Sequence, residues 1–319
     1  MPIFGGRPKT FVDEAQGDAE AGRLRAAAAA KDWRQVETAL LATTDPLRRE
    51  FLIDRIVDDT KDLGWVESWV NEKPADETAR LMWGRCAIQY AWNIRSGRAP
   101  QHVSKEQFQG FFEWLGHAEE QLGNAASMDP RDPEPYVGLL WSGVGLQVDR
   151  EEEAARWELA VERNPRTQVG LWAYTTHISP KWHGSAELMW GFLRDFLSRE
   201  PEGSPRWVMV PMAHFEEAVE AGMHGNTSVR GTGHFEKPDV QRDITDAYAK
   251  SLASAAKQPS PFEWSNRQFF AVAFYLMGAR ELLRKEMQGI GPGIQSHPWA
   301  YLGNSIGIYE KAREWAGLR

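Results

Sequence analysis

The sequence predicts an all-α fold built as a stack of helical hairpins. Apolar residues recur with a period near 3.6 along most of the chain, and no segment alternates convincingly with a period of two. Gly and Pro are missing from most of the expected helix interiors and stand at most junctions. A hairpin-sized pattern also recurs along the chain, which indicates an α-solenoid in which each hairpin packs against its neighbours.

The recurring hairpin is clearest in the middle of the chain. Ala118, Leu122 and Ala125, followed by Pro130, have the spacing of the second helix of a tetratricopeptide (TPR) unit and its closing proline. The same offsets recur before Pro165. Small residues at these positions let two helices approach closely, and one hairpin alone cannot bury its apolar face. The spacing therefore predicts a TPR-like array.

Residues 1–10 are expected to form a flexible tail, and residues 11–319 a single TPR-like helical-repeat domain. In its first half, Asp45 before Pro46 marks a helix start, and Ser104 with Gln107 forms a capping box. Helices are expected at residues 14–31, 32–41, 46–57, 63–71, 77–94 and 104–128, with two more opened by Asp132-Pro133 and by Asp149.

The pattern continues beyond Pro165, with helical segments at residues 167–178, 185–200, 206–222, 239–257 and 262–279. Pro211 should kink or split one of them. Residues 223–238 are expected to form the one long irregular loop, and loops of this length are usually functional or disordered. The final segment, 298–315, is interpreted as a lone C-terminal capping helix that covers the last hairpin.

Composition restricts the environment and the partners. The net charge of −8 argues against a nucleic-acid partner. Cys86 is the only cysteine, so one chain cannot form an internal disulfide, which favours a reducing compartment. No signal peptide and no membrane-spanning run is recognised. We therefore expect a cytoplasmic protein without a membrane partner. The 15 tryptophans fit a helical core, a binding groove or both.

Five segments, DWRQVETALL, AWNIRSG, NAASMDPRDPEPY, SPKWHGSAELMWGF and PEGSPRWVMVPMAHFEE, together resemble a bacterial, largely actinobacterial TPR-like family that is catalogued as a domain of unknown function. The resemblance runs from about Ala29 to Ala221. Its most specific piece is KWHGS…M…F followed by PEGS…AH. The resemblance implies a helical-repeat fold and a cytosolic bacterial protein, and it implies no activity and no catalytic residues.

The best candidate site lies in the segment where histidines concentrate. One hypothesis is a polar cluster in a groove that would suit an extended peptide or a small anionic ligand. Its residues are Trp172, His177, Lys181, Trp182, His183, Trp207, His214 and Glu217. The competing interpretation is that these side chains serve packing, since tryptophans at helical spacing are usually part of a core.

A metal site is a second hypothesis for the same segment. His183 with Glu187, and His214 with Glu217, are spaced to share helix faces, as a carboxylate-bridged metal site in a helical bundle requires. The order is the reverse of the Glu-x-x-His pattern of di-iron proteins. Glu187 in the first turn of a helix and histidines in turns or in the core explain the same residues without a metal.

Two further motifs give weaker evidence for a functional site. Asp58, Asp59 and Asp62 match the DDxxD diphosphate–magnesium signature of terpene cyclases, but the second metal motif of those enzymes is missing, and a solvated helix end also explains the aspartates. Gly225 to His234 is glycine-rich, but it follows no strand and has no phosphate-loop spacing.

The sequence thus favours a non-catalytic binding or scaffold protein that takes a peptide or protein partner in its concave face and uses no cofactor. The alternative is a helical enzyme or metalloprotein of a biosynthetic pathway, with a site around His183, Glu187, His214 and Glu217.

Overall fold

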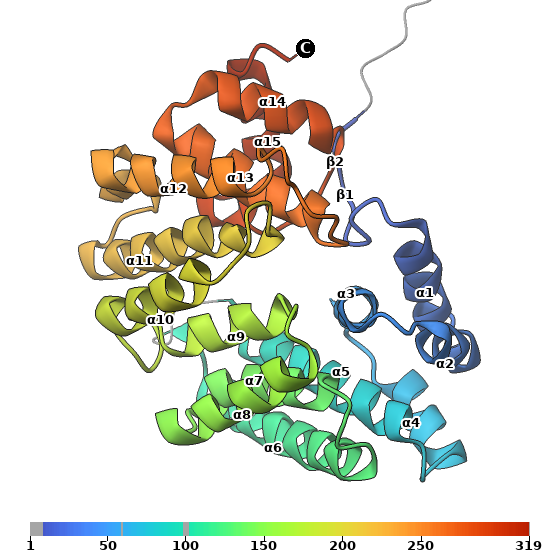
Figure 1. Ribbon diagram of the computed structural model, residues 1–319. Coiled ribbons are helices and arrows are strands. Elements are labelled where there is room, and N and C mark those ends of the chain that lie inside the picture. Colours follow the sequence, from blue (N-terminus) through green and yellow to red (C-terminus); the bar gives the residue numbers. More distant parts are fainter. Residues whose placement is uncertain (1–8, 59, 98–101, 319) are drawn as a thin grey trace, which may run out of the picture. The chain divides into compact units, whose positions relative to one another are not determined.

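The computed structural model describes residues 9–58, 60–97 and 102–318, which form fifteen α-helices, several short 3-10 helices and one two-stranded sheet (Figure 1). The predicted all-α class is confirmed. Within these residues, no helix is both long enough and apolar enough to span a bilayer.

The chain divides into two compact units, where the sequence suggests one domain for residues 11–319. The N-terminal unit is Asp18–Ile178, and the C-terminal unit is Ser179–Arg319 together with Met1–Gly17. The helices of the N-terminal unit are α1 (Ala19–Ala29), α2 (Trp33–Ala42), α3 (Pro46–Val57), α4 (Gly64–Glu72), α5 (Glu77–Arg95), α6 (Lys105–Met128), α7 (Glu134–Leu146), α8 (Arg150–Arg163) and α9 (Val169–His177).

Local sequence signals set several helix starts in the N-terminal unit. The Asp45 side chain accepts a hydrogen bond from the Leu47 amide at 3.0 Å, and Pro46 occupies the first turn of α3. The predicted capping box of Ser104 and Gln107 forms at the start of α6. A cap of this kind satisfies backbone N–H groups that have no partner inside the helix.

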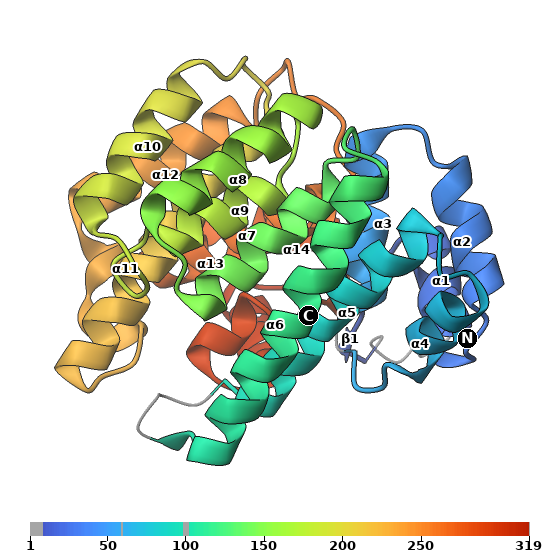
Figure 2. The ribbon, with the colours of Figure 1, turned by 90° about the horizontal axis from the view of Figure 1, so that it is seen from below.

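Helices α5 to α9 pack in sequence order, each against the next, and α7 also contacts α5 and α9 (Figure 2). Leu122 of α6 lies at a close approach of α5, α6 and α7. A Cβ atom at Gly84 of α5 would lie 2.6 Å from Leu122 Cγ, and one at Gly138 of α7 would lie 2.8 Å from Leu122 Cδ1. Two glycines therefore make room for one leucine, while Ala118 and Ala125 on the same helix are fully buried.

Helix α3 packs against α5 and α9 and caps α9 from outside. Gln168, the residue before α9, makes no side-chain cap of its own. The buried Glu50 carboxylate instead accepts hydrogen bonds from the backbone amides of Gln168 at 3.2 Å, Val169 at 3.0 Å and Gly170 at 3.3 Å. A carboxylate at a helix N-terminus is favoured both by these bonds and by the helix dipole.

Ion pairs join α3 to α5 and to the start of α7. Arg49 of α3 pairs with Asp132 at 2.7 Å. Arg85 of α5 lies 3.1 Å from Glu134 of α7 and 3.6 Å from Asp54 of α3, and both Arg85 and Glu134 are buried. Helix α3 therefore covers a face to which α5 and α9 contribute.

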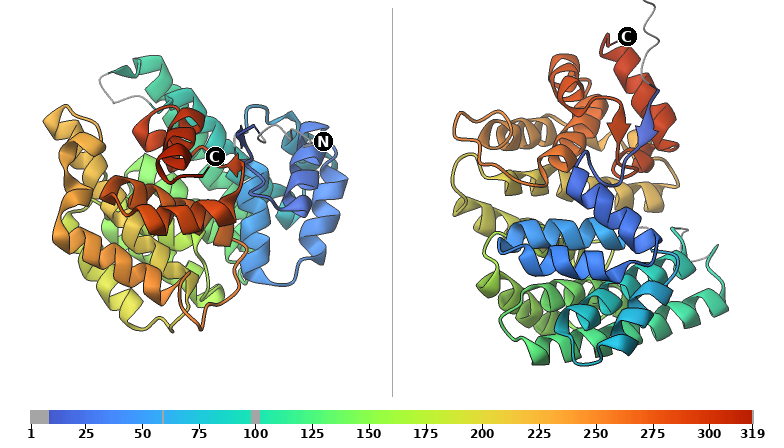
Figure 3. Two further views of the ribbon diagram at one scale, coloured as in Figure 1. Left: turned by 90° about the horizontal axis from the view of Figure 1, so that it is seen from above. Right: turned by 90° about the vertical axis from the view of Figure 1, so that its right-hand side faces the viewer.

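The C-terminal unit contains α10 (Ala186–Ser198), η2 (Pro205–Val208), α11 (Met209–Gly225), η3 (Arg230–Thr232), η4 (His234–Glu236), α12 (Pro238–Lys250), α13 (Glu263–Met277), α14 (Arg280–Ile290), η5 (Trp299–Leu302) and α15 (Ser305–Trp315). Strand β1 (Phe11–Val12) pairs in parallel with β2 (Gly293–Ile294), which ties the beginning of this unit to its end (Figure 3).

The two ends of the chain differ from the sequence expectation. Residues 1–8 of the predicted tail lie outside the described residues, and Thr10 at its end is buried because β1 follows directly. The predicted capping helix 298–315 is divided. Gly303, with φ at 128°, separates η5 from α15, and Asn304 caps the new helix by accepting from the Gly307 amide.

The middle of the C-terminal unit also has more regular structure than expected. A 3-10 turn precedes α11, so Pro211 falls in the first turn of α11, where its missing N–H removes no helical hydrogen bond. The segment 223–238, expected to be an irregular loop, completes α11 and then forms η3 and η4. His234 and Phe235 are buried, which gives the segment a fixed position in its unit.

The Leu122 contact predicts a measurable coupling. Gly138→Ala places a methyl group against Leu122, so we expect it to lower the free energy of unfolding by about 1–2 kcal/mol. In a Leu122→Ala background this cost should shrink by at least about 1 kcal/mol, as a double-mutant cycle in urea would show. Gly123→Ala is the control, since nothing lies within 4 Å of a Cβ there. Equal costs in both backgrounds would contradict the contact.

Candidate functional site

Three side chains converge in the C-terminal unit. His214 and Glu217 lie three residues apart on α11, and His234 opens η4. The His214 Nδ1 atom lies 3.1 Å from His234 Nε2 and 3.6 Å from Glu217 Oε2, and His234 Nε2 lies 3.7 Å from the same oxygen. Both histidines are buried, whereas the Glu217 side chain is 24% exposed. We call these three residues the His–Glu–His cluster.

Two further side chains surround the His–Glu–His cluster. Asp243 of α12 places its Oδ2 atom 3.8 Å from Nε2 of His214, the ring nitrogen that faces away from the cluster. Trp190 of α10 packs its ring 4.7 Å from the His214 ring, and it is one of the groups that lower the pKa of Glu217. Helices α10, α11 and α12 together with η4 thus all contribute to this place.

The charge states follow from this packing. Burial alone would raise the pKa of Glu217, but the neighbouring His214 and Trp190 side chains outweigh burial and hold that pKa below its usual range. Burial lowers the pKa of His234 to about 4, and the neighbouring His214 adds to the effect. At neutral pH the cluster therefore contains an ionised carboxylate facing a neutral imidazole of His234.

A second polar group lies beside the first, around Glu216 of α11. The Tyr301 hydroxyl donates to Glu216 Oε1 at 3.3 Å, and Phe215 stacks on the Tyr301 ring at 5.0 Å. Burial raises the pKa of Glu216, while the Lys181 ammonium and the Tyr301 hydroxyl oppose the rise. Burial also lowers the pKa of His297 to about 4, and Lys181 contributes to that shift.

A buried acid lies in the N-terminal unit. Glu153 of α8 is fully buried, with one carboxylate oxygen 3.5 Å from Nδ1 of His177. Gly143 of α7 makes room for it, because a Cβ there would lie 2.2 Å from the other oxygen. Burial raises the pKa of Glu153 to about 8, with Arg156 opposing and Glu119 adding to the rise.

The residues of the predicted groove are divided between the units. Trp172 and His177 lie on α9 of the N-terminal unit, where Trp172 meets Trp141 edge to face at 5.3 Å. The other six lie in the C-terminal unit. Lys181, Trp182 and His183 form the turn before α10, and Lys181 Nζ lies 5.2 Å from the centre of the Trp182 ring.

Trp207, His214 and Glu217 complete the predicted groove set. Trp207 lies in η2 with Lys250 Nζ 4.3 Å from the centre of its ring. His214 and Glu217 come together as the spacing suggests, but their third partner is His234. Of the other two residues in the metal hypothesis, Glu187 is exposed in the first turn of α10 and His183 is half-buried.

Sequence reasoning did not place His234, Asp243, Glu216 or Tyr301 in a site. His234 lies 20 residues from His214. Its position in the glycine-rich stretch was visible, but periodicity cannot show which helix such a stretch packs against. Of the DDxxD aspartates, Asp59 lies outside the described residues, while Asp58 pairs with Arg55 and Asp62 pairs with Lys31.

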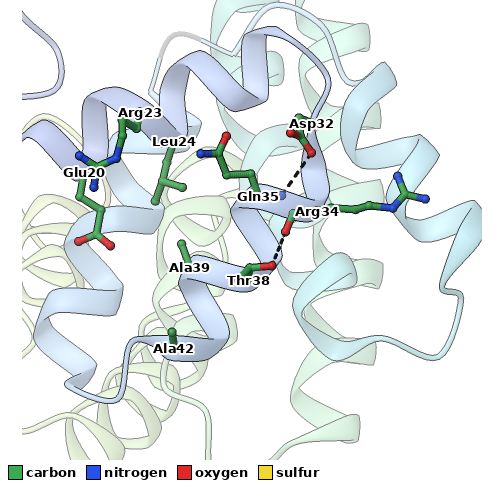
Figure 4. Close-up of a pocket in the computed structure, with 9 residues that line it drawn as sticks. All are labelled: Glu20, Arg23, Leu24, Asp32, Arg34, Gln35, Thr38, Ala39 and Ala42. Atoms are coloured by element: carbon green, nitrogen blue, oxygen red, sulfur yellow. Dashed lines mark hydrogen bonds between the residues drawn. The ribbon is translucent and has the colours of Figure 1, made fainter.

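An open groove lies between α1 and α2 of the N-terminal unit (Figure 4). It has a volume of about 730 Å³. Its lining residues are Glu20, Arg23, Leu24, Asp32, Arg34, Gln35, Thr38, Ala39 and Ala42. Its size lies within the range of small-ligand pockets, and its lining combines apolar residues with both signs of charge.

No protein-family model matches the chain, and no curated protein matches it.

The buried Glu153 predicts a pH dependence. Its pKa in the folded protein is about 8, above the ordinary value of 4.5, so the folded state keeps a proton that the unfolded state loses. Between about pH 5 and 8 this group makes stability fall as pH rises, by up to about 1.4 kcal/mol per pH unit. Glu153→Gln removes that fall. As pH rises through this range, Glu153→Gln should therefore become more stable relative to the parent.

Urea unfolding at a series of pH values measures this difference. Glu151→Gln, an exposed glutamate in the first turn of the same helix, is the matched control and should follow the parent. Parallel pH profiles for Glu153→Gln and the parent would show that Glu153 is ionised in the folded protein.

Proposed function

We propose that this chain is a non-catalytic TPR-like protein of the bacterial cytoplasm that binds a peptide or protein partner. The observation that carries the proposal is the packing of α5 to α9. Helices α5 and α6 form one pair, α7 and α8 the next, and α7 contacts both α5 and α9. Stacking of the first helices of successive hairpins is the arrangement that repeat arrays use to build extended binding surfaces.

The interior of this array suggests where a partner does not bind. Helix α3 packs on α5 and α9, and Glu50, Arg49 and Asp54 join it to their neighbours through the buried contacts described above. A partner helix or strand on that face would have to displace α3 and leave these charges without their present partners. We therefore place the partner elsewhere in the N-terminal unit.

The α1–α2 groove is the surface that we propose for the partner. Leu24, Ala39 and Ala42 supply apolar contact for a side chain. Among the charged lining residues, Glu20 already pairs with Arg48 and Arg34 with Glu72. The exposed Arg23 makes no ion pair within the described part of the chain, and so it is available for a carboxylate. The groove suits a short peptide segment with an apolar residue next to an acidic one.

We also propose two further properties of this chain. The first is membership of the TPR-like family of unknown function. The second is ligand binding by Lys181, Trp182, His183 and Trp207, for which Lys181→Ala should reduce partner capture without lowering the melting temperature.

A random peptide library displayed on phage tests the groove. Peptides enriched on the full-length protein should contain an apolar residue beside an acidic one, and Ala39→Phe, which fills the groove, should weaken their binding at least about tenfold. Arg23→Glu should weaken acidic peptides selectively. Ala29→Phe is the matched control, because Ala29 is exposed on α1 and does not line the groove. Enriched peptides that bind Ala39→Phe and Arg23→Glu as well as the parent would overturn the assignment.

A further inference from the structure

The His–Glu–His cluster has the donor set of a transition-metal site. Two imidazole nitrogens and one carboxylate oxygen are the ligands that Zn²⁺ and its neighbours in the first transition row accept in proteins. Among the described residues, these three offer ligand atoms that all lie within 4.8 Å of one another. Two of the three residues are fixed on one helix, α11, and the third is held by the buried segment η4.

The spacing of the donor atoms also fits. A tetrahedral zinc ion with bonds of about 2.0–2.1 Å holds its ligand atoms about 3.3–3.4 Å apart. The three separations in the cluster are 3.1, 3.6 and 3.7 Å. An ion can therefore be accommodated with movements of a few tenths of an ångström, which side-chain rotation supplies.

The surroundings match those of metal-bound histidines. A ligating imidazole usually donates its second N–H to a carboxylate or carbonyl, which fixes the ring and its tautomer. Asp243 faces Nε2 of His214 in this way at 3.8 Å, while Nδ1 faces the cluster. Within the described residues, Nε2 of His214 makes no hydrogen bond. If Nδ1 bound a metal ion, Nε2 would carry the proton, and a shorter contact with Asp243 would then be favoured. Trp190 packs against the His214 ring, with the ring centres 4.7 Å apart.

We propose that His214, Glu217 and His234 bind one divalent transition-metal ion, with Zn²⁺ as the best match, and that Asp243 positions His214 for it. Three protein ligands leave one position of a tetrahedral ion for water or another small ligand, whereas a purely structural zinc site has four protein ligands. Glu217, the most exposed of the three, marks the side open to solvent. The site joins η4 to α11 and is independent of peptide binding in the α1–α2 groove.

The test uses the untagged full-length protein, stripped with a chelator and titrated with Zn²⁺ against a chromophoric competitor. We expect one Zn²⁺ per chain, and a Co²⁺-loaded sample with the visible absorption of a tetrahedral nitrogen–oxygen site. His234→Ala should bind at least about 100-fold more weakly, and Asp243→Asn about 10–100-fold more weakly. Should His234→Ala fail to fold by circular dichroism, Glu217→Gln, at a partly exposed position, replaces it.

The same helix supplies a matched control. His224 and Glu220 form a histidine–carboxylate pair at 2.6 Å on α11, with the His224 side chain 80% exposed. His224→Ala should leave stoichiometry and affinity unchanged. Absence of stoichiometric Zn²⁺ binding, a Co²⁺ spectrum without tetrahedral absorption, or equal loss in His224→Ala and His234→Ala would each overturn the proposal.

Discussion

The N-terminal unit depends on one buried carboxylate, that of Glu50, at the beginning of α9. The first turn of any helix has amide groups without partners, and α9 has no side-chain cap of its own. Glu50 accepts from Thr167 and from three consecutive amides, and burial, partly offset by these bonds, raises its pKa to about 7. Glu50 can reach these amides only when α3 packs beside the start of α9, so the interaction fixes the position of α3 against α9.

The ion pairs among α3, α5 and the start of α7 extend the same constraint. Arg85 and Glu134 are almost completely enclosed, so neither charge can be left alone, and removing one member of such a pair typically costs about 3–5 kcal/mol. A buried pair adds little net stability relative to apolar residues, but it penalises every arrangement that separates its members. These contacts therefore specify which helices meet. They also make the face of α5 and α9 that lies under α3 an internal interface.

Much of the local structure could be predicted from the sequence, because its causes are local. Period, caps and prolines act within a few residues, so the helices after Asp45 and Ser104 begin where these signals stand. The meetings of distant residues could not be predicted in this way. In the sequence, Glu50 has no feature that distinguishes it from other helical glutamates, and its role depends on the position of α9 beside it. His234 was visible as one of several histidines, but its contact with His214 depends on how the segment after α11 folds back. The break in the final segment could not be predicted, because a glycine is compatible with a helix interior as well as with the positive φ of 128° that Gly303 adopts.

Both units place charged or titratable side chains where a helical array would normally have leucine or alanine, and in each unit these groups connect segments that are distant in sequence. In the N-terminal unit the connection is complete within the protein, since Glu50 and Arg85 have their partners there. The His–Glu–His cluster differs. Three potential ligands face one another across 3.1–3.7 Å, and only one of those approaches, between the two imidazoles, has the geometry of a hydrogen bond. The Glu217 carboxylate and both imidazoles can each offer a lone pair to a metal ion, and Trp190 and Asp243 lie beside His214. A cation would use all three lone pairs at once, and for that reason we propose a binding site for this cluster and not for the Glu50 network.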